Sequence, residues 1–277
     1  MKNSKWSFAA IATTIALIVS GFMLLALPIS ASAQNLPYKS CKEDALKASL
    51  SLSAASSATQ AATQAATAAA TASAPSAATT GGDNIVFLSI VGSESEACYT
   101  TAETFLKDNM MGLPPGFNGA VGITKTIKGD VALDLTNVAN SQIGDITINI
   151  SEFQSDNSLR DNYIRSHFLE SNTFPFVTLT NASAIGLPGG AYKDGDTLKF
   201  QIKGTLTAHG KKRDTTFDAT GSYTGGALVV RAVTVLNMSD FGIQPPNIAN
   251  LLKVEDTLQL VVNMVAREAQ ATPAATQ

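Results

Sequence analysis

Apolar and polar side chains alternate with a period of two through the middle and end of the chain. The segments ITINIS at 146–151, LKFQIK at 198–203 and LQLVVNMV at 258–265 show this pattern. It predicts strands that bury one face, because successive side chains of a strand point to opposite sides. Similar runs lie at 85–91, 95–104, 131–138, 176–182, 214–223 and 227–237.

Turn signals such as Gly225-Gly226 and His209-Gly210 separate these runs, so neighbouring strands are expected to pair as antiparallel hairpins. About eight such strands can hide their edges by closing into a barrel, which makes the predicted fold class all-β. Because the strands are long, we expect an elongated barrel with room for one ligand unless inward side chains fill it. A β-sandwich is the alternative, since alternation does not distinguish the two.

One charged stretch, SLRDNYIRSHFL from Ser158 onward, predicts a short helix. Ser158 is expected to cap its first turn, with Asp161 reaching back in a capping-box arrangement. Leu159, Tyr163 and Phe168 are expected near one side, where they would present aromatic rings to the barrel interior. Two interpretations remain open: a lid over a ligand site, or a plug that closes one end of the barrel.

The first 33 residues have the pattern of a signal peptide. Lys2 and Lys5 precede a long apolar run, and Ala31-Ser32-Ala33 forms a small-residue cleavage site. The alternative is an uncleaved membrane anchor through residues 7–29, because the run is about as long as the ~20 residues that span a bilayer. Both interpretations place the remainder of the chain outside the cytoplasm: secreted, periplasmic or at the cell surface.

Low-complexity segments flank one folded domain, expected at residues 84–267. Residues 34–83 are rich in Ala, Thr and Ser and predict a linker or stalk, since such a sequence cannot bury enough apolar surface to fold alone. Residues 268–277 form a similar tail. Cys41 and Cys98 are the only cysteines. An exported chain permits a disulfide between them, but two separate thiols are an equal alternative.

Charge and composition exclude several classes of function. Only 15% of the residues are charged and the formal net charge is −3, so we expect no nucleic-acid partner. The only histidines, His167 and His209, lack further ligands at metal-binding spacing. The sequence has no G-x-S-x-G motif and no phosphate loop, so it predicts neither an enzyme nor a bound cofactor.

Three blocks of sequence follow one another in a specific order. The first, within 146–179, combines an apolar strand with Ser155-Asp156, Arg160-Asp161, Phe168-Leu169 and Phe174-Pro175. The second is GTLTAHG at 204–210, and the third is MSDFGI at 238–243. Together they resemble the signature of the YceI-like polyisoprenoid-binding family over about residues 84–267. The chain departs from that pattern at 107–122, KDNMMGLPPGFNGAVG, which is expected to be a longer loop.

The resemblance implies a lipocalin-like barrel that holds a long apolar lipid, such as a polyprenyl lipid or a quinone, without chemical turnover. Arg160 and Asp161 are the candidate polar binding residues, and the planar fork of Arg160 suits a phosphate or carboxylate head group at the barrel mouth; the alternative is a structural Arg160–Asp161 pair. The candidate apolar lining, each member of which could equally be ordinary core, is Ile148, Phe153, Phe168, Phe176, Val177, Leu179, Phe200, Ile202, Leu206, Phe217, Leu260 and Val262.

Two other functions compete with lipid binding. A surface interaction module displayed on the stalk would have a filled barrel core. A lipid hydrolase or isomerase would need a convergent polar cluster with shifted pKa values inside the barrel. The sequence shows no such cluster, so the first of these is the main alternative.

Overall fold

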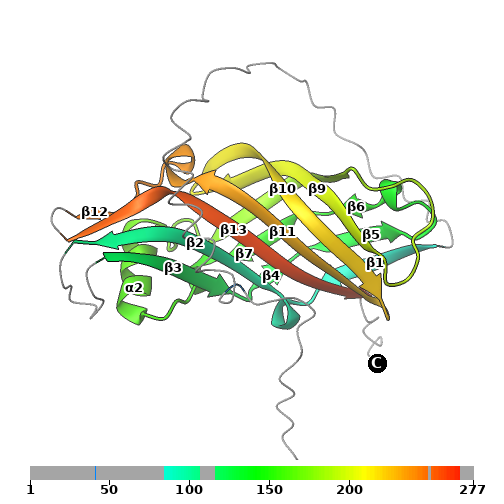
Figure 1. The fold of residues 1–277 in the computed structure, drawn as a ribbon, viewed down its shortest axis with the longest axis horizontal. Coiled ribbons are helices and arrows are strands. Elements are labelled where there is room, and N and C mark those ends of the chain that lie inside the picture. The colour runs from blue at the N-terminus through cyan, green and yellow to red at the C-terminus, as the bar shows by residue number, and fades with distance from the viewer. Residues whose placement is uncertain (1–40, 42–83, 107–115, 249–250, 269–277) are drawn as a thin grey trace, which may run out of the picture. The chain divides into compact units, whose positions relative to one another are not determined.

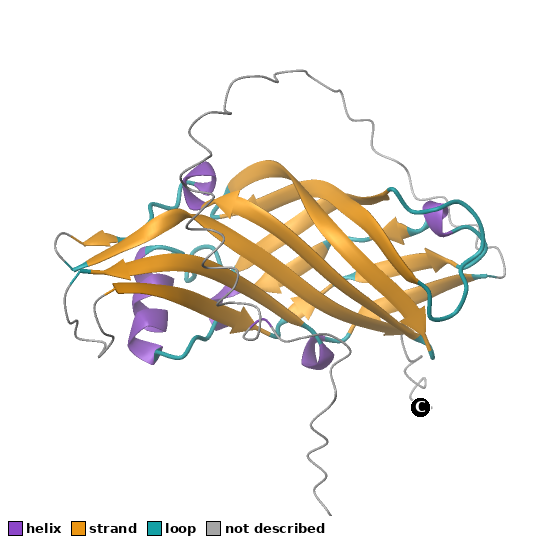
Figure 2. Cartoon of the chain, viewed as in Figure 1, coloured by secondary structure: helices purple, strands orange, loops and turns teal. Residues whose placement is uncertain are grey.

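The computed structural model describes residue 41 and residues 84–106, 116–248 and 251–268. Thirteen strands form one antiparallel sheet, with one α-helix and several 3₁₀ turns among the described residues (Figures 1 and 2). The strands are β1 Ile85–Ile90, β2 Glu96–Phe105, β3 Gly116–Thr124, β4 Ile127–Lys128, β5 Asp130–Asp134, β6 Gln142–Ile143, β7 Ile146–Asn149, β8 Phe176–Ile185, β9 Thr197–Ala208, β10 Lys211–Thr224, β11 Ala227–Asn237, β12 Asn247–Ile248 and β13 Leu252–Glu268. The helix is α2 Ser158–His167, and the 3₁₀ turns are η2 Gly92–Glu94, η3 Val138–Asn140, η4 Ile150–Glu152 and η5 Met238–Phe241.

Several short strands are pieces of longer chain segments that curve around the barrel. β1 and β2 follow each other along one side of β13, and both pair with it. β3, β4 and β5 form a second interrupted segment, which pairs with β2 through β3, with β7 through β4 and with β1 through β5. β7 then pairs with β8, and the order continues through β9, β10, β11 and β13. These pairings close a ring of chain segments, which confirms the predicted all-β, lipocalin-like barrel.

The alternating sequence pattern determines which side chains enter this ring. In β9 and β10, Ile202 faces Phe217 across the ladder, and both are buried. Leu260 and Val262 on β13 alternate with residues of the outer face and join the same apolar core as Ile148. The strands at 146–149, 176–185, 211–224 and 227–237 match the predicted runs closely, because each has one apolar face. The core therefore lies inside the barrel.

The predicted loop at 107–122 is wrong in its second half. Gly116–Thr124 is strand β3, paired with β2 over its whole length. The segment lacks an alternating apolar pattern, so its sequence does not reveal the strand. Gly122 has a packing role there: a Cβ atom at this position would lie 2.2 Å from the Tyr99 ring of the paired strand. Residues 107–115 lie outside the described part of the chain.

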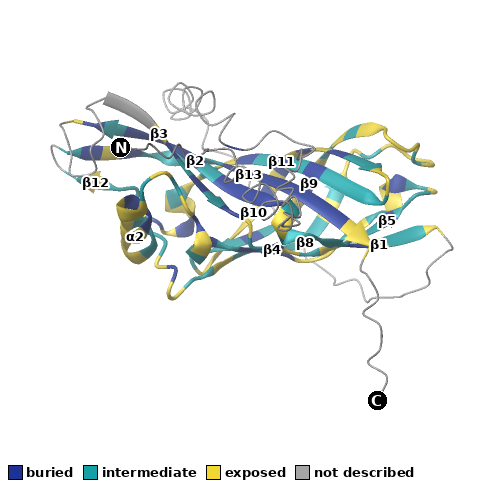
Figure 3. Cartoon of the chain, turned by 90° about the horizontal axis from the view of Figure 1, so that it is seen from below, coloured by how far each residue is buried: buried dark blue, intermediate teal, exposed yellow. Residues whose placement is uncertain are grey.

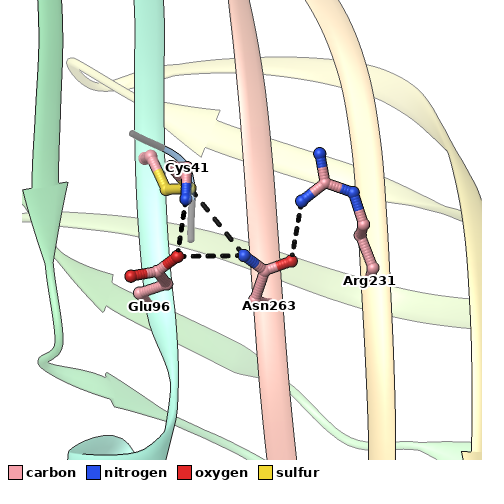
Figure 4. Close-up of a disulfide and its surroundings, with 5 residues drawn as sticks. Cys41, Glu96, Arg231 and Asn263 are labelled. Atoms are coloured by element: carbon pink, nitrogen blue, oxygen red, sulfur yellow. Dashed lines mark hydrogen bonds between the residues drawn. A yellow bond between two sulfur atoms is a disulfide. The ribbon is translucent and has the colours of Figure 1, made fainter. Parts of the chain in front are cut away.

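Cys41 and Cys98 form a disulfide, which answers the question the sequence left open. Their Cα atoms are 6.3 Å apart, and both residues are buried with Val261 on the outer face of the sheet. The backbone N–H of Cys41 donates to the Glu96 carboxylate at 2.9 Å, and Asn263 donates to the same oxygen at 3.1 Å (Figure 4). The disulfide therefore links Cys41 covalently to strand β2.

Helix α2 lies at one end of the barrel, beside β2 and β3 and far from β1 and β5 (Figures 1 and 3). Its N-cap is Asn157, whose side chain accepts from the N–H groups of Leu159 and Arg160, so the predicted Ser158 cap is wrong by one residue. Asp161 reaches back instead to Ser155, whose N–H donates to it at 3.0 Å. Among the described residues, no helix is long and apolar enough to cross a membrane. The predicted leader, linker and tail lie outside the described residues apart from Cys41 and Glu268, which is the last residue of β13.

Candidate functional site

An apolar cavity of about 130 Å³ lies inside the barrel at the α2 end. Phe153, Ile164 and Phe168 line it on the helical side, and Phe241 of η5 and Ile243, which follows that turn, also line it. A site for one water needs ~10–15 Å³ on the same measure, so this cavity has room for roughly ten waters or a similar number of methylene groups. Side chains therefore do not fill the barrel interior, whereas the interaction-module alternative predicts a filled interior.

Two smaller cavities continue this space along the barrel. The middle cavity, of about 30 Å³, shares Ile148, Val177, Leu206 and Leu260 with the first, so these four side chains separate the two spaces. The far cavity, of about 70 Å³, is lined by residues of β5 and β6 as well as by Phe200. It shares Ile202 and Met264 with the middle cavity. The three cavities thus lie in a row from the α2 end to the opposite end, separated only by apolar side chains.

The structure places most of the predicted apolar lining along this row. The cavities are lined by Ile148, Phe153, Phe168, Val177, Leu179, Phe200, Ile202, Leu206, Phe217, Leu260 and Val262. Phe176 is the exception, because its side chain lies on the outside and is 52% exposed. Its neighbour in sequence, Val177, takes the inward position, as the alternation of a strand requires. The prediction that both line the interior is therefore wrong for Phe176.

Arg160 and Asp161 are buried but do not line any of the three cavities. Arg160 is 5% exposed and its Nη1 lies 3.4 Å from the carboxylate of Glu103, which is 2% exposed. Its Nη2 contacts Asp156, one turn earlier in the chain. The predicted Arg160–Asp161 pair is therefore wrong, because Arg160 takes Asp156 and Glu103 as partners while Asp161 accepts from Ser155.

This arrangement also corrects the expected orientation of α2. Arg160 and Asp161 occupy its buried side next to the half-buried Ile164, whereas Leu159 and Tyr163 are exposed. In a helix, residues three and four apart share a face, so the inward side formed by positions 160, 161, 164 and 168 leaves 159 and 163 outside. Only Phe168 of the three predicted inward side chains lines the cavity. His167 stacks on Tyr163 and is exposed.

The sequence pattern does not reveal the polar residues of the first cavity. Tyr99, Thr101 and Glu103 on β2 face it, and His209 lies at the β9–β10 turn. β2 reads EACYTTAETF, in which polar side chains stand on both faces, so the pattern does not mark the inner one. His209 was expected as a turn residue, and it does adopt a left-handed backbone with φ 48°. In addition its ring lines the cavity, with Nε2 3.4 Å from the Glu170 carboxylate.

Burial shifts the pKa values of two of these residues on β2, Glu103 and Tyr99. Removal from water raises the pKa of Glu103, and the Arg160 guanidinium opposes that shift. Burial likewise raises the pKa of Tyr99, whose ring packs edge-on against Phe153 at 5.1 Å, so its hydroxyl stays neutral. Within the described part of the chain, one group of three residues has metal-ligand chemistry: Cys41, Glu96 and Cys98. Its two sulfur atoms are bonded to each other, and the group lies on the outer face.

The closed ring of strands and its internal row of apolar cavities define a lipocalin-like barrel protein. The YceI-like domain family model matches residues 104–266, and the chain therefore belongs to that family. The match covers the barrel from the end of β2 to the end of β13, including all three blocks of the sequence signature. No curated protein matches the chain.

Solved structures similar to the chain include three bacterial proteins. The crystal structure of Burkholderia cenocepacia BcnA is 17% identical, with a TM-score of 0.48, and the match covers 64% of this chain and 98% of that one. A polyisoprenoid binding domain from Saccharophagus degradans, implicated in plant cell wall breakdown, is 9% identical, with a TM-score of 0.46 and coverages of 67% and 99%. The Campylobacter jejuni YCEI protein is 20% identical, with a TM-score of 0.41 and coverages of 53% and 83%.

Proposed function

We propose that this protein binds a lipid with a long apolar chain, such as a polyprenyl lipid or a quinone, inside the barrel and releases it chemically unchanged. The observation that carries the proposal is the row of three apolar cavities running from the α2 end to the opposite end. An extended hydrocarbon chain fits such a row, whereas a compact ligand would use only the first cavity. Membership of the YceI-like family agrees with this function.

Burial of methylene groups drives binding in this proposal, at ~0.8 kcal/mol for each group. The four side chains between the first and middle cavities, Ile148, Val177, Leu206 and Leu260, would shift rotamers to admit the chain. The ordering of a flexible chain opposes part of the gain. The arrangement needs no reacting group, and the protein therefore acts as a carrier or reservoir.

We also propose that the barrel works outside the cytoplasm. The leader-like sequence of residues 1–33 supports export, and so does the Cys41–Cys98 disulfide, because disulfides persist mainly in oxidising compartments. The same leader, if uncleaved, would tether the barrel to a membrane through residues 7–29.

Native mass spectrometry of the chain purified without detergent tests the binding function. We expect a stoichiometric adduct that solvent extraction identifies as a long isoprenoid or fatty chain. A clean apo mass that stays unchanged after incubation with polyprenols and quinones would refute the proposal.

A further inference from the structure

One buried nitrogen in the lining of the first cavity has no hydrogen-bond partner. The Nε2 atom of His209 is shielded from solvent, and the imidazole ring lines the cavity among mainly apolar side chains. The Glu170 carboxylate lies 3.4 Å from this nitrogen but without the geometry of a hydrogen bond. Buried polar groups normally have a partner, so a ligand can supply the one that Nε2 lacks.

The surrounding backbone holds the imidazole ring in this place. His209 and Gly210 form the two-residue turn between β9 and β10, with φ of 48° and 70°. The ring of Phe174 packs against the imidazole with the centroids 4.6 Å apart. Glu170 also has a left-handed backbone, with φ 45°, so two of the three such non-glycine residues in the described chain meet at one contact. Strained backbone of this kind clusters at ligand-binding sites.

The neighbouring carboxylate indicates which chemical group fits Nε2. Glu170 favours the form of His209 that carries a hydrogen on Nε2, because an ionised carboxylate accepts hydrogen bonds and donates none. The side chain of Glu170 is 53% exposed. Ion pairs with an exposed member are weak, so this side chain can turn into the solvent at little cost. A ligand carboxylate can then take its place at the Nε2 hydrogen.

The acidic residue of the cavity lining does not prevent an anion from binding. Glu103 is paired with the buried Arg160 at 3.4 Å, and burial raises the pKa of its carboxyl group, so little negative charge is left uncompensated. None of the residues that line the cavity is Lys or Arg. A single N–H donor therefore suits a carboxylate better than a phosphate ester, which is usually bound by several donors or cations.

We infer that the first cavity binds the carboxylate head of a long-chain acid at Nε2 of His209, and that the ligand displaces the Glu170 carboxylate from this position. This inference rests on the proposed lipid-binding function and adds the head group to it. The head lies at the α2 end of the barrel, and the tail extends along the row of cavities toward the middle one. His209 thereby determines the specificity for the head group.

Binding of geranylgeranoic acid and of geranylgeraniol, which share one chain, tests the inference. The affinities are measured at neutral pH, where the acid is ionised, by calorimetry or by displacement of a fluorescent fatty probe. The wild-type protein should bind the acid about tenfold more tightly than the alcohol, because a hydrogen bond to a charged group is stronger than one to a neutral group. Geranylgeranyl phosphate, the third ligand, should bind more weakly than the acid.

Two variants assign the effect to the two residues of this contact. His209→Asn removes the imidazole and retains the turn, because asparagine followed by glycine is the preferred sequence of such a turn. It should weaken binding of the acid about tenfold and change binding of the alcohol less than about threefold. Glu170→Gln removes the competing charge and should strengthen binding of the acid about threefold. His167→Asn is the matched control, since His167 is exposed and lines none of the cavities, and it should change neither affinity.

The outcomes separate this inference from the function on which it rests. Equal affinities for the acid and the alcohol, or a ratio that survives in a folded His209→Asn protein, would overturn the head-group site and leave lipid binding intact. Tighter binding of the phosphate than of the acid would overturn the choice of a carboxylate. Weaker binding of the acid by Glu170→Gln would overturn its displacement. Binding of none of the three ligands would overturn lipid binding itself. If His209→Asn does not fold, the wild-type ratio and Glu170→Gln still decide.

Discussion

Filling the middle cavity should divide the row of cavities into two. Ala232 on β11 lines this cavity, whose volume is about 30 Å³. Ala232→Leu adds three carbon atoms to a space with room for about two waters, so the side chain should block the passage. The extra packing strain should cost ~1–3 kcal/mol of folding stability, which thermal unfolding will report.

The effect on binding follows from the cavity volumes. On the same measure, the first cavity has room for roughly ten methylene-sized groups, and the middle and far cavities together for roughly seven more. Loss of those additional groups removes up to ~6 kcal/mol of burial energy. A shorter bound segment also loses less conformational entropy, so the net loss of binding free energy is about half of that value. We therefore expect a C20 prenol to bind Ala232→Leu about a hundredfold more weakly, and a C10 prenol to bind within about twofold of wild type.

Isothermal calorimetry across a chain-length series from C10 to C20 measures this directly. Val235→Leu is the matched control, because it enlarges an exposed side chain on the outer face of the same strand. An unchanged preference for C20 over C10 in a folded Ala232→Leu protein would show that the tail does not pass through the middle cavity.

Three further perturbations test the parts that support the site. Arg160→Ala leaves Glu103 buried without its partner and should destabilise the fold by ~3–5 kcal/mol in urea denaturation; a loss under 1 kcal/mol would mean that the pair is not buried as described. The pKa of Glu103 is raised in the folded state, so the native state binds more protons than the unfolded state, and stability falls as pH rises above the ordinary carboxyl pKa. The Tm of the wild type relative to that of Glu103→Gln should therefore decrease from pH 4 to pH 7. A Tm difference that stays constant over this range would contradict the raised pKa. Reduction of the Cys41–Cys98 disulfide, with a sequence separation of 57, should lower the unfolding free energy by ~4 kcal/mol on the loop-entropy model, and no change in the denaturation midpoint would argue against the bond.

Much of the barrel could be predicted because its strands bury one face. The alternation in 146–151 and 198–203 reports an inside and an outside, and the structure places Ile148 and Ile202 inside as expected. β3 could not be found in this way, because GFNGAVGIT has glycine where one expects large apolar residues. Its pairing with β2 depends on a tertiary contact, the Tyr99 ring over Gly122, which no local pattern reveals.

The site shows the same division. Apolar lining residues follow from strand alternation, with Phe176 and Val177 as the instructive pair: neighbours on one strand cannot both face the cavity. The charged residues were harder to place. The sequence suggests Asp161 as the partner of Arg160 because only local partners are visible in it, whereas the buried partner Glu103 is 57 residues away in the chain. The buried Arg160–Glu103 pair is consequently a feature that only the fold brings together.

Photo-crosslinking tests most directly the claim that the lipid chain lies inside the barrel. A long prenol carrying a diazirine at its tail end would be bound, irradiated and mapped by peptide mass spectrometry. The account predicts adducts on residues of the far cavity, such as Phe200, Tyr223 and Leu228. Adducts on exposed side chains such as Leu159, Phe176 or Val235 would show that the chain binds the outer surface and would contradict the account.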